Sequence, residues 1–293
     1  MSSSPPAVKE TFAAKPPSVA RAVLRSPEGL TGVILGAILL VIIVFGPMFA
    51  PYPPDQIGAG LPLQLPSSEH LMGTDQLGRD VFSRWLNGGR SVILAPLASV
   101  AIALVLGGFF GLLAAYKGGA IDEVVTRIFD VFIILPPLVL VLVLIAGFGS
   151  TTPVLIITVA LVFAPRMGRV IRGAAQGVVT SDYVASAQAR GERTGAILFR
   201  EILPNIAAPT IADTALRITY AIIFIATLNF LGLGLQPPAS DWGLMVAEYR
   251  GFIAVQPWAT IWPAVGIAAL SVSFNLVADS ISGHITKTGS HKS

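Results

Sequence analysis

The stretch SDYVASAQARGERTGAILFREILPN, residues 181–205, organises the rest of this chain. Long apolar segments lie on either side of it, whereas the stretch itself is rich in charge. Its charged side chains are Asp182, Arg190, Glu192, Arg193, Arg200 and Glu201. A structured, charged connection is not needed to join two membrane spans. We therefore expect this segment to bind a cytoplasmic partner and to carry that partner's motion into the bilayer.

Local signals in this stretch predict a helical hairpin. A side-chain oxygen of Ser181 or Asp182 can cap a helix start by accepting from free backbone N–H groups. Gly191 stands where a helix would end in a left-handed residue, a conformation that glycine tolerates best. Pro204 is expected to end the second helix. The predicted order is therefore a helix over 183–190, a turn at Gly191, a helix over 192–203 and a stop at Pro204.

Composition places the whole chain in a membrane. Hydrophobic residues make up 54% of the 293 positions and charged residues 12%, about half the share of a soluble protein. The mean hydropathy is +0.76. The chain has no cysteine, which excludes disulfides and thiolate chemistry.

Six apolar runs are each close to the roughly 20 residues that cross a bilayer. They cover residues 30–50, 92–116, 128–148, 152–172, 206–230 and 258–281. The segment before them is rich in Ser, Pro and Ala and is expected to be flexible. A secretory signal peptide is a poor alternative, because the first run is long and meets Pro51 where cleavage would be needed.

The Lys and Arg distribution predicts the orientation. With the N-terminus inside, 14 of the 19 basic residues lie on the cytoplasmic side. Both termini and the hairpin are then cytoplasmic. The expected divisions are a tail over 1–28, a first span over 29–51, an outer loop over 52–90, a five-helix core over 91–282 that includes the 181–205 hairpin, and a tail over 283–293.

The outer loop ends in HLMGTDQLGRDVFSRWLNGGRS, residues 70–91. Thr74 is a plausible helix cap, and apolar residues follow in helical spacing with charges on the other faces. This pattern predicts an amphipathic helix at the membrane interface. Its role is either a clasp that holds the outer end of the second span or a contact with the substrate, and we favour the clasp.

Several polar residues fall inside or beside the spans. Asp130 is expected to pair with Arg127 or with a basic residue of the hairpin, near a kink at Pro136 and Pro137. Asp213 and Arg217 are four residues apart and can pair on one helix face. The candidates in this class are Asp130, Asp213, Arg217, Asn229 and Asp279. A structural role is favoured for the charged members, and Asn229 either lines a pathway or bonds a neighbouring helix.

The segment 230–258 is predicted to form a re-entrant turn and a short amphipathic helix. It has many Gly, Pro and polar residues, which do not suit a simple span. Its tryptophans and tyrosine are expected to form a belt at the membrane interface. The belt residues are Trp242, Tyr249, Trp258 and Trp262.

Three motifs resemble permeases of ABC importers, most closely the C-type subunit of the dipeptide/oligopeptide family. In the hairpin, Ala187, Gly191, Leu203 and Pro204 match the family's loop motif. Ala185 stands where the family often has Glu, Ser186 replaces Ala, and Glu201 replaces Ile. In the outer loop the matching residues include Thr74, Asp75, Gly78, Arg79, Asp80, Arg84 and Arg90. Near the C-terminus the matches are 230–238, Trp242, Gly243, 274–276 and Asp279.

The resemblance implies an all-α, six-helix permease of the type I importer fold in the bacterial cytoplasmic membrane. It implies a homologous second permease subunit, one or two cytoplasmic ATPase subunits, and an extracellular or lipid-anchored binding protein that delivers peptides. Membrane lipid surrounds the chain, and no nucleic acid is expected. The implied ATPase-coupling residues are Asp182, Tyr183, Ala185, Ser186, Ala187, Gln188, Gly191, Arg193 and Pro204.

The sequence lacks the G-x-x-x-x-G-K-[ST] loop of P-loop ATPases and the H-E-x-x-H and G-x-S-x-G motifs. We therefore expect no enzyme, no metal and no cofactor on this chain, with ATP and Mg bound by the partner subunits. Two alternatives stay open. One is an importer of the same fold for nickel chelates, glutathione or another small solute, and the other is an ion-driven secondary transporter.

Overall fold

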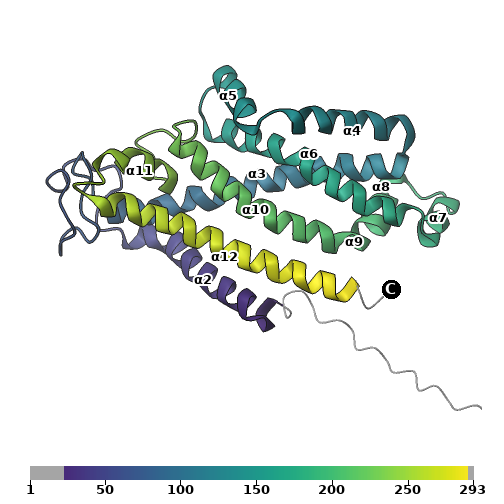
Figure 1. The fold of residues 1–293 in the computed structure, drawn as a ribbon, viewed down its shortest axis with the longest axis horizontal. Helices are drawn as coiled ribbons and strands as arrows, with labels where there is room; N and C mark the ends of the chain where they lie inside the picture. The colour runs from purple at the N-terminus through teal and green to yellow at the C-terminus, as the bar shows by residue number, and fades with distance from the viewer. Residues whose placement is uncertain (1–22, 290–293) are drawn as a thin grey trace, which may run out of the picture.

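The computed structural model describes residues 23–289, so residues 1–22 and 290–293 of the expected tails over 1–28 and 283–293 lie outside the described residues. The described chain is built from helices joined by turns (Figure 1). The membrane-length helices are α2 (Pro27–Phe45), α3 (Val81–Lys117), α6 (Thr152–Val179), α10 (Ala207–Phe230) and α12 (Pro257–Gly289). The shorter elements are η1 (Gly46–Phe49), α4 (Gly119–Ile134), α5 (Pro137–Phe148), α7 (Asp182–Ala189), α8 (Thr194–Ala196), the π-helix η2 (Ile197–Ile202), α9 (Leu203–Asn205), α11 (Trp242–Tyr249) and η3 (Arg250–Phe252).

The third predicted span is broken. Five helices are long and apolar enough to cross a membrane, and a sixth span is reached by counting α4 and α5 together. These two helices meet at 90°. Leu135 has an extended backbone with ψ of 128°, which is the conformation that a following proline imposes. The proline pair therefore ends α4 and starts α5, where the sequence had predicted only a kink within one helix.

Small residues bring α3 and α6 into close contact at the centre of the molecule. A Cβ atom on Gly107 would lie 2.2 Å from the carbonyl oxygen of Ala164, and one on Gly111 would lie 2.4 Å from that of Gly168. Each helix thus presents two small residues four positions apart, a spacing that allows membrane helices to approach closely. Larger apolar residues of α3, α6 and α10 pack around this contact.

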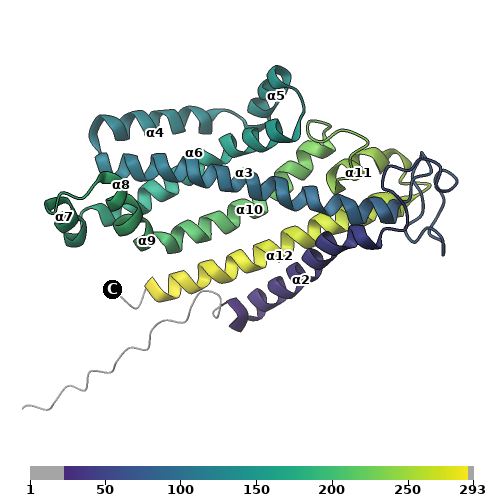
Figure 2. The ribbon, with the colours of Figure 1, turned by 180° about the vertical axis from the view of Figure 1, so that it is seen from behind.

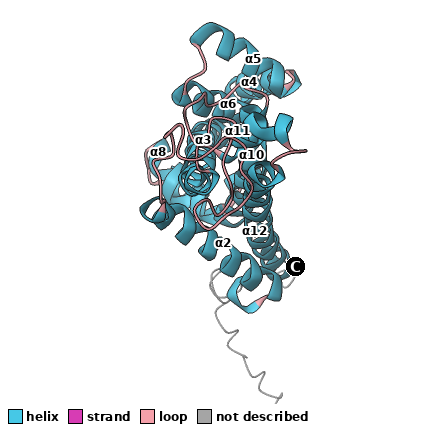
Figure 3. Cartoon of the chain, turned by 90° about the vertical axis from the view of Figure 1, so that its left-hand side faces the viewer, coloured by secondary structure: helices cyan, strands magenta, loops and turns pink. Residues whose placement is uncertain are grey.

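Helices α2 and α12 pair along their lengths, although they are the first and last spans of the chain (Figure 2). Ser273 donates a hydrogen bond to the carbonyl oxygen of Gly32 at 2.9 Å, and the hydroxyl groups of Ser26 and Ser280 lie 2.6 Å apart. A Cβ atom on Gly36 would meet the Ser273 hydroxyl at 2.5 Å. Seen along the helices, this pair forms one side of the molecule, while α4 and α5 form the opposite side (Figure 3).

The two polar regions lie at opposite ends of the bundle. Helix α7 lies at the same end as the start of α2 and the end of α12, whereas α11 and the loop before α3 lie at the other end (Figures 1 and 2). We call these the hairpin end and the loop end. The start of α2 and the end of α12 lie at the same end, as an even number of spans requires. The assignment of the hairpin end to the cytoplasm remains a prediction from the basic residues.

The expected interfacial helix is not a separate element. Residues 52–80 form turns, and the helix that begins at Val81 continues without interruption as the second span. The carboxylate of Asp80 caps its start by accepting from the backbone N–H of Ser83 at 2.7 Å. Thr74, the predicted cap, instead donates to the carbonyl oxygen of Leu61 at 2.5 Å.

Candidate functional site

The hairpin folds as a short helix, a glycine turn and a second, irregular helix. Ser181 occupies the N-cap position of α7, but its hydroxyl group turns back to the carbonyl oxygen of Val178 and does not cap the helix. Gly191 has a φ of +73°, which confirms the predicted left-handed turn. The second helix begins at Thr194, two residues later than predicted.

The end of the hairpin differs from the prediction. Its second helix passes through a π-helical segment, Ile197–Ile202, before Pro204. Pro204 lies inside α9 and the chain resumes as α10 at Ala207, so the proline does not act as a stop. It lies within the first turn of a short helix, where a missing N–H group is tolerated.

One face of the hairpin is anchored to the bundle. Val184 and Ala187 of α7 are fully buried and lie in one cluster with Ile197 and Ile202 of η2. The same cluster includes Leu112 of α3 and residues of α6. Apolar contacts therefore join the hairpin to the two helices at the centre of the molecule.

The opposite face of the hairpin is exposed. Of the nine predicted coupling residues, only Ala187 is buried, and it belongs to the anchoring face. The exposed ones are Asp182, Tyr183, Ala185, Ser186, Gln188, Gly191, Arg193 and Pro204. Arg190 and Glu192 pair with each other at 2.6 Å beside the turn. This face is free to contact another protein.

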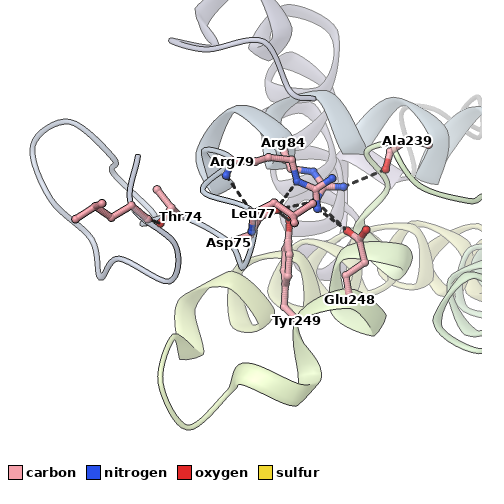
Figure 4. Close-up of polar contacts among 9 residues, drawn as sticks. Thr74, Asp75, Leu77, Arg79, Arg84, Ala239, Glu248 and Tyr249 are labelled. Atoms are coloured by element: carbon pink, nitrogen blue, oxygen red, sulfur yellow. Dashed lines mark hydrogen bonds and ion pairs between the residues drawn. The ribbon is translucent and has the colours of Figure 1, made fainter. Parts of the chain in front are cut away.

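Charged residues are buried at the loop end (Figure 4). Asp75 is completely buried and accepts hydrogen bonds from the side chains of Arg79 at 2.6 Å, Tyr249 at 3.1 Å and Arg84 at 3.2 Å. Arg84, also completely buried, donates to Glu248 at 2.8 Å. We call these five residues the loop-end cluster. Burial raises the pKa of the Tyr249 hydroxyl, so this group stays protonated and serves as a hydrogen-bond donor.

The loop-end cluster joins segments that are far apart in the sequence. The outer loop contributes Asp75 and Arg79, α3 contributes Arg84, and α11 contributes Glu248 and Tyr249. Arg79 and Arg84 were predicted to lie on the charged faces of an interfacial helix, and Tyr249 was predicted to lie in an aromatic belt. The structure instead brings them together between the outer loop, α3 and α11. The geometry favours the clasp over substrate contact for the outer motif.

Other residues of the outer motif support the same loop. Asp80 lies 2.9 Å from the Nδ1 atom of His70, and both are buried. Gly78 has a φ of +71° and a Cβ there would meet the carbonyl oxygen of Gly60 at 2.3 Å. Arg90 donates to the carbonyl oxygen of Val44 at 3.0 Å, at the end of the first span.

The polar candidates of the spans have diverse partners. Asp130 pairs with Arg169 of α6, and not with Arg127 or a hairpin residue as predicted. Asp213 and Arg217 pair at 2.9 Å, which confirms the local pair. Asn229 is buried and donates to Asp241 at 2.8 Å. Asp279 is exposed on α12.

Two polar contacts were missed by the sequence analysis. Arg172 of α6 donates two hydrogen bonds to Asp122 of α4, one of them at 2.6 Å. Asp241 is fully buried and caps α11 by accepting from the backbone N–H of Gly243 at 2.8 Å, while its second oxygen accepts from Ser91. An Asp directly before a helical stretch is the signal that could have identified this cap.

The predicted aromatic belt is only half correct. Trp242 and Tyr249 are buried, and the Trp242 ring stacks on Trp85 with centroids 5.4 Å apart. Trp258 and Trp262 are partly exposed, as an interfacial position requires. Among residues 23–289, no group of three or more His, Cys, Asp or Glu side chains gathers as metal ligands.

The structure is a bundle of helices long enough to span a membrane, with one exposed, charged hairpin, and comparison with known proteins identifies the family. Residues 107–288 match the family described as "Binding-protein-dependent transport system inner membrane component", and the chain belongs to it. It is therefore a multi-span protein of the bacterial inner membrane.

Curated relatives cover most of the chain. It is 33% identical to the dipeptide transport system permease protein DppC of Alkalihalophilus pseudofirmus, over 88% of this chain and 84% of that protein. It is 37% identical to the probable D,D-dipeptide transport system permease protein DdpC of Escherichia coli, over 87% and 86%. The glutathione transport system permease protein GsiD of Pectobacterium atrosepticum is 37% identical over 74% of this chain and 72% of that protein.

A solved structure confirms the fold. A chain of the MetNI methionine ABC transporter, in an inward-facing conformation, superposes with a TM-score of 0.56 at 17% identity. The match covers 68% of this chain and 94% of that chain. The type I importer fold expected from the sequence is thus correct.

Proposed function

We propose that this chain is one of two permease subunits of an ATP-driven importer of dipeptides or oligopeptides. The observation that carries this proposal is its 33–37% identity to dipeptide and di/tripeptide permeases over most of both chains. Together the two subunits form the pathway, and a binding protein outside the membrane delivers the peptide to them. The loop end then faces that binding protein.

The hairpin is the proposed site of energy transfer. Its exposed face offers Asp182, Tyr183 and Arg193 to a cytoplasmic ATPase subunit, while its buried face contacts α3 and α6. Because that contact is closely packed, a displacement of the hairpin moves the inner ends of both helices. The 293-residue sequence has no P-loop of its own, which supports ATP hydrolysis by the partner.

The first experiment is purification of the chain together with the proteins encoded beside it, followed by transport in proteoliposomes. We expect ATPase subunits and a second permease to co-purify, and dipeptide uptake to require ATP and the binding protein. Glutathione and nickel chelates serve as rival solutes in the same assay. Uptake driven by an ion gradient without ATP would contradict the proposal and direct attention to the Asp213–Arg217 pair.

The Gly191 turn gives a sharper test of coupling. Gly191→Ala places a side chain in a left-handed conformation, which costs about 1–2 kcal/mol. We expect uptake per ATP hydrolysed to fall about 5- to 30-fold, the population change that this energy produces, while the complex stays assembled. Gly195→Ala is the matched control, because Gly195 lies in a helix with open space around it and no positive φ. Equal uptake by both variants would contradict the coupling role.

A further inference from the structure

A groove with an unbalanced positive charge lies between α6 and α10. Its volume is about 320 Å³, and Pro137 at the start of α5 closes one side. Two arginines line it, Arg166 of α6 and Arg217 of α10, together with aromatic residues. The rings of Phe163 and Phe224 meet edge to face there, with centroids 6.2 Å apart.

Arg166 differs from the other arginines of its helix face. Arg166, Arg169 and Arg172 follow one another at three-residue spacing. Arg169 pairs with Asp130 and Arg172 with Asp122. Arg166 donates to the carbonyl oxygen of Val162 at 2.6 Å and has no acidic partner within the part of the chain that the structure describes.

The second arginine of the groove is already neutralised. Arg217 pairs with Asp213 at 2.9 Å on the same helix. The groove therefore carries one net positive charge, that of Arg166. Arg217 also lines the groove, although its charge is balanced by Asp213. Such a pair of donors favours one additional negative charge.

The depth of Arg166 indicates that its face of α6 does not contact lipid. It lies 14 residues after the start of α6, about 21 Å along the helix at 1.5 Å per residue. An ionised group at that depth is costly in hydrocarbon and is found facing a bundle interior or a water-filled cavity.

Helix α10 also contributes polar side chains to the groove. Arg217, Tyr220 and Thr227 recur at helical spacing on the side that borders the groove, beside the apolar Ile223 and Phe224. The opposite side, with Ile222, is buried against the rest of the bundle. The two helices thus place a few polar side chains in a mainly apolar groove.

We propose that this groove binds the C-terminal carboxylate of a peptide as it crosses the membrane. Arg166 is the counter-ion, since its planar guanidinium matches a carboxylate with two parallel hydrogen bonds. Arg217, held in place by Asp213, is the second donor, and Phe163 and Phe224 contact the adjacent side chain of the peptide. The volume is at the lower end of small-molecule pockets, which suits the end of a short peptide. This inference rests on the proposed import of peptides.

The test measures binding to the purified transport complex in lipid nanodiscs without the binding protein, so that only the membrane subunits select. The probes are radiolabelled alanyl-phenylalanine and its C-terminal amide. We expect wild type to bind the free acid at least about tenfold more tightly than the amide, the effect of about 1.4 kcal/mol. Arg166→Gln should abolish this preference and Arg166→Lys should retain part of it. Arg169→Gln, which removes a charge one turn away, should leave the preference intact.

Several results would overturn the proposal. These are equal affinity of wild type for acid and amide, no binding of either probe, or an unchanged preference in Arg166→Gln. If Arg166→Gln instead released the second permease subunit from the complex and left the preference unaltered, Arg166 would pair with a carboxylate of that subunit. Failure of ATP-dependent peptide uptake by wild type is a separate readout, and it alone would reject the proposed function.

Discussion

At the loop end of the molecule charged residues are buried and pair with one another, whereas at the hairpin end they are exposed and apolar residues hold the chain together. Asp75 and Arg84 have no exposed surface, while the side chain of Arg190 is 57% exposed. Conversely, Val184 and Ile202 of the hairpin are completely buried. Two charged motifs therefore have opposite roles. The charges of the loop-end cluster pair with one another inside the protein, whereas those of the hairpin are exposed and can contact a partner.

The largest expected effect comes from breaking the loop-end cluster. Arg84→Ala leaves Arg79 as the remaining cation beside the buried Asp75 and the partly buried Glu248, and removing one member of a buried pair costs about 3–5 kcal/mol. We expect a large drop in the thermal unfolding temperature of the purified complex.

The matched variant at the other end is Arg190→Ala. The Arg190–Glu192 pair is exposed, and exposed pairs contribute at most about 1 kcal/mol. Its unfolding temperature should match wild type. Equal destabilisation by the two variants would disprove the contrast between the two ends.

A smaller effect is expected from the apolar anchor of the hairpin. Ile202→Ala removes a fully buried side chain from the cluster with Leu112 and Val184, at a cost of about 2–5 kcal/mol. We expect the hairpin to detach locally, with faster protease cleavage near Gly191 and loss of uptake. Phe199→Ala is the control, because Phe199 lies in the same helix with 54% of its surface exposed. Cleavage as slow as in wild type would show that the anchor is dispensable.

The smallest effect concerns Asp241, the buried cap of α11. Asparagine can bond the same partners, so Asp241→Asn should change stability by less than about 1 kcal/mol at low pH. Burial raises the pKa of Asp241 above its ordinary value of 3.8, against the opposing hydrogen bonds from Ser91, Leu244 and Asn229.

The pH dependence follows from that direction. The pKa of Asp241 is higher in the folded state than in the unfolded state. Protonated Asp241 therefore contributes its full stabilisation below the unfolded-state pKa, and this stabilisation is lost as the pH rises through the folded-state pKa. As the pH is raised from 4, the unfolding temperature of wild type should therefore fall relative to that of Asp241→Asn. A constant difference across this range would show that the carboxyl group does not change its proton occupancy on folding.

Local patterns predicted most of the spans and the hairpin turn. Apolar runs of membrane length and a glycine at the C-terminal end of a helix act within a few residues, and both appear in the structure at the expected places. The proline pair at 136 and 137 was visible in the sequence as well. The 90° angle between α4 and α5, however, depends on how α5 packs and not on the prolines alone.

The loop-end cluster could not be predicted in the same way. Arg84 reads locally as an exposed charge on an amphipathic helix, because its partners Glu248 and Tyr249 lie about 160 residues later. The same applies to Asp130, whose partner Arg169 is on another helix. A sequence pattern shows which residues are charged, while burial is decided by elements that meet only after folding.

The pairing of α2 with α12 has a consequence for synthesis of the protein. Roughly 210 residues separate these helices. At a synthesis rate of about 5–20 residues per second, α12 is therefore made about 10–40 seconds after α2. During that interval its glycine face, including Gly32 and Gly36, is exposed to lipid or to an insertion factor. The nascent chain therefore passes through a stage in which five spans have been made and the first contacts α3 only near its outer end, through Ile43 and Val44. The serines of α12 cover the rest of the first span last.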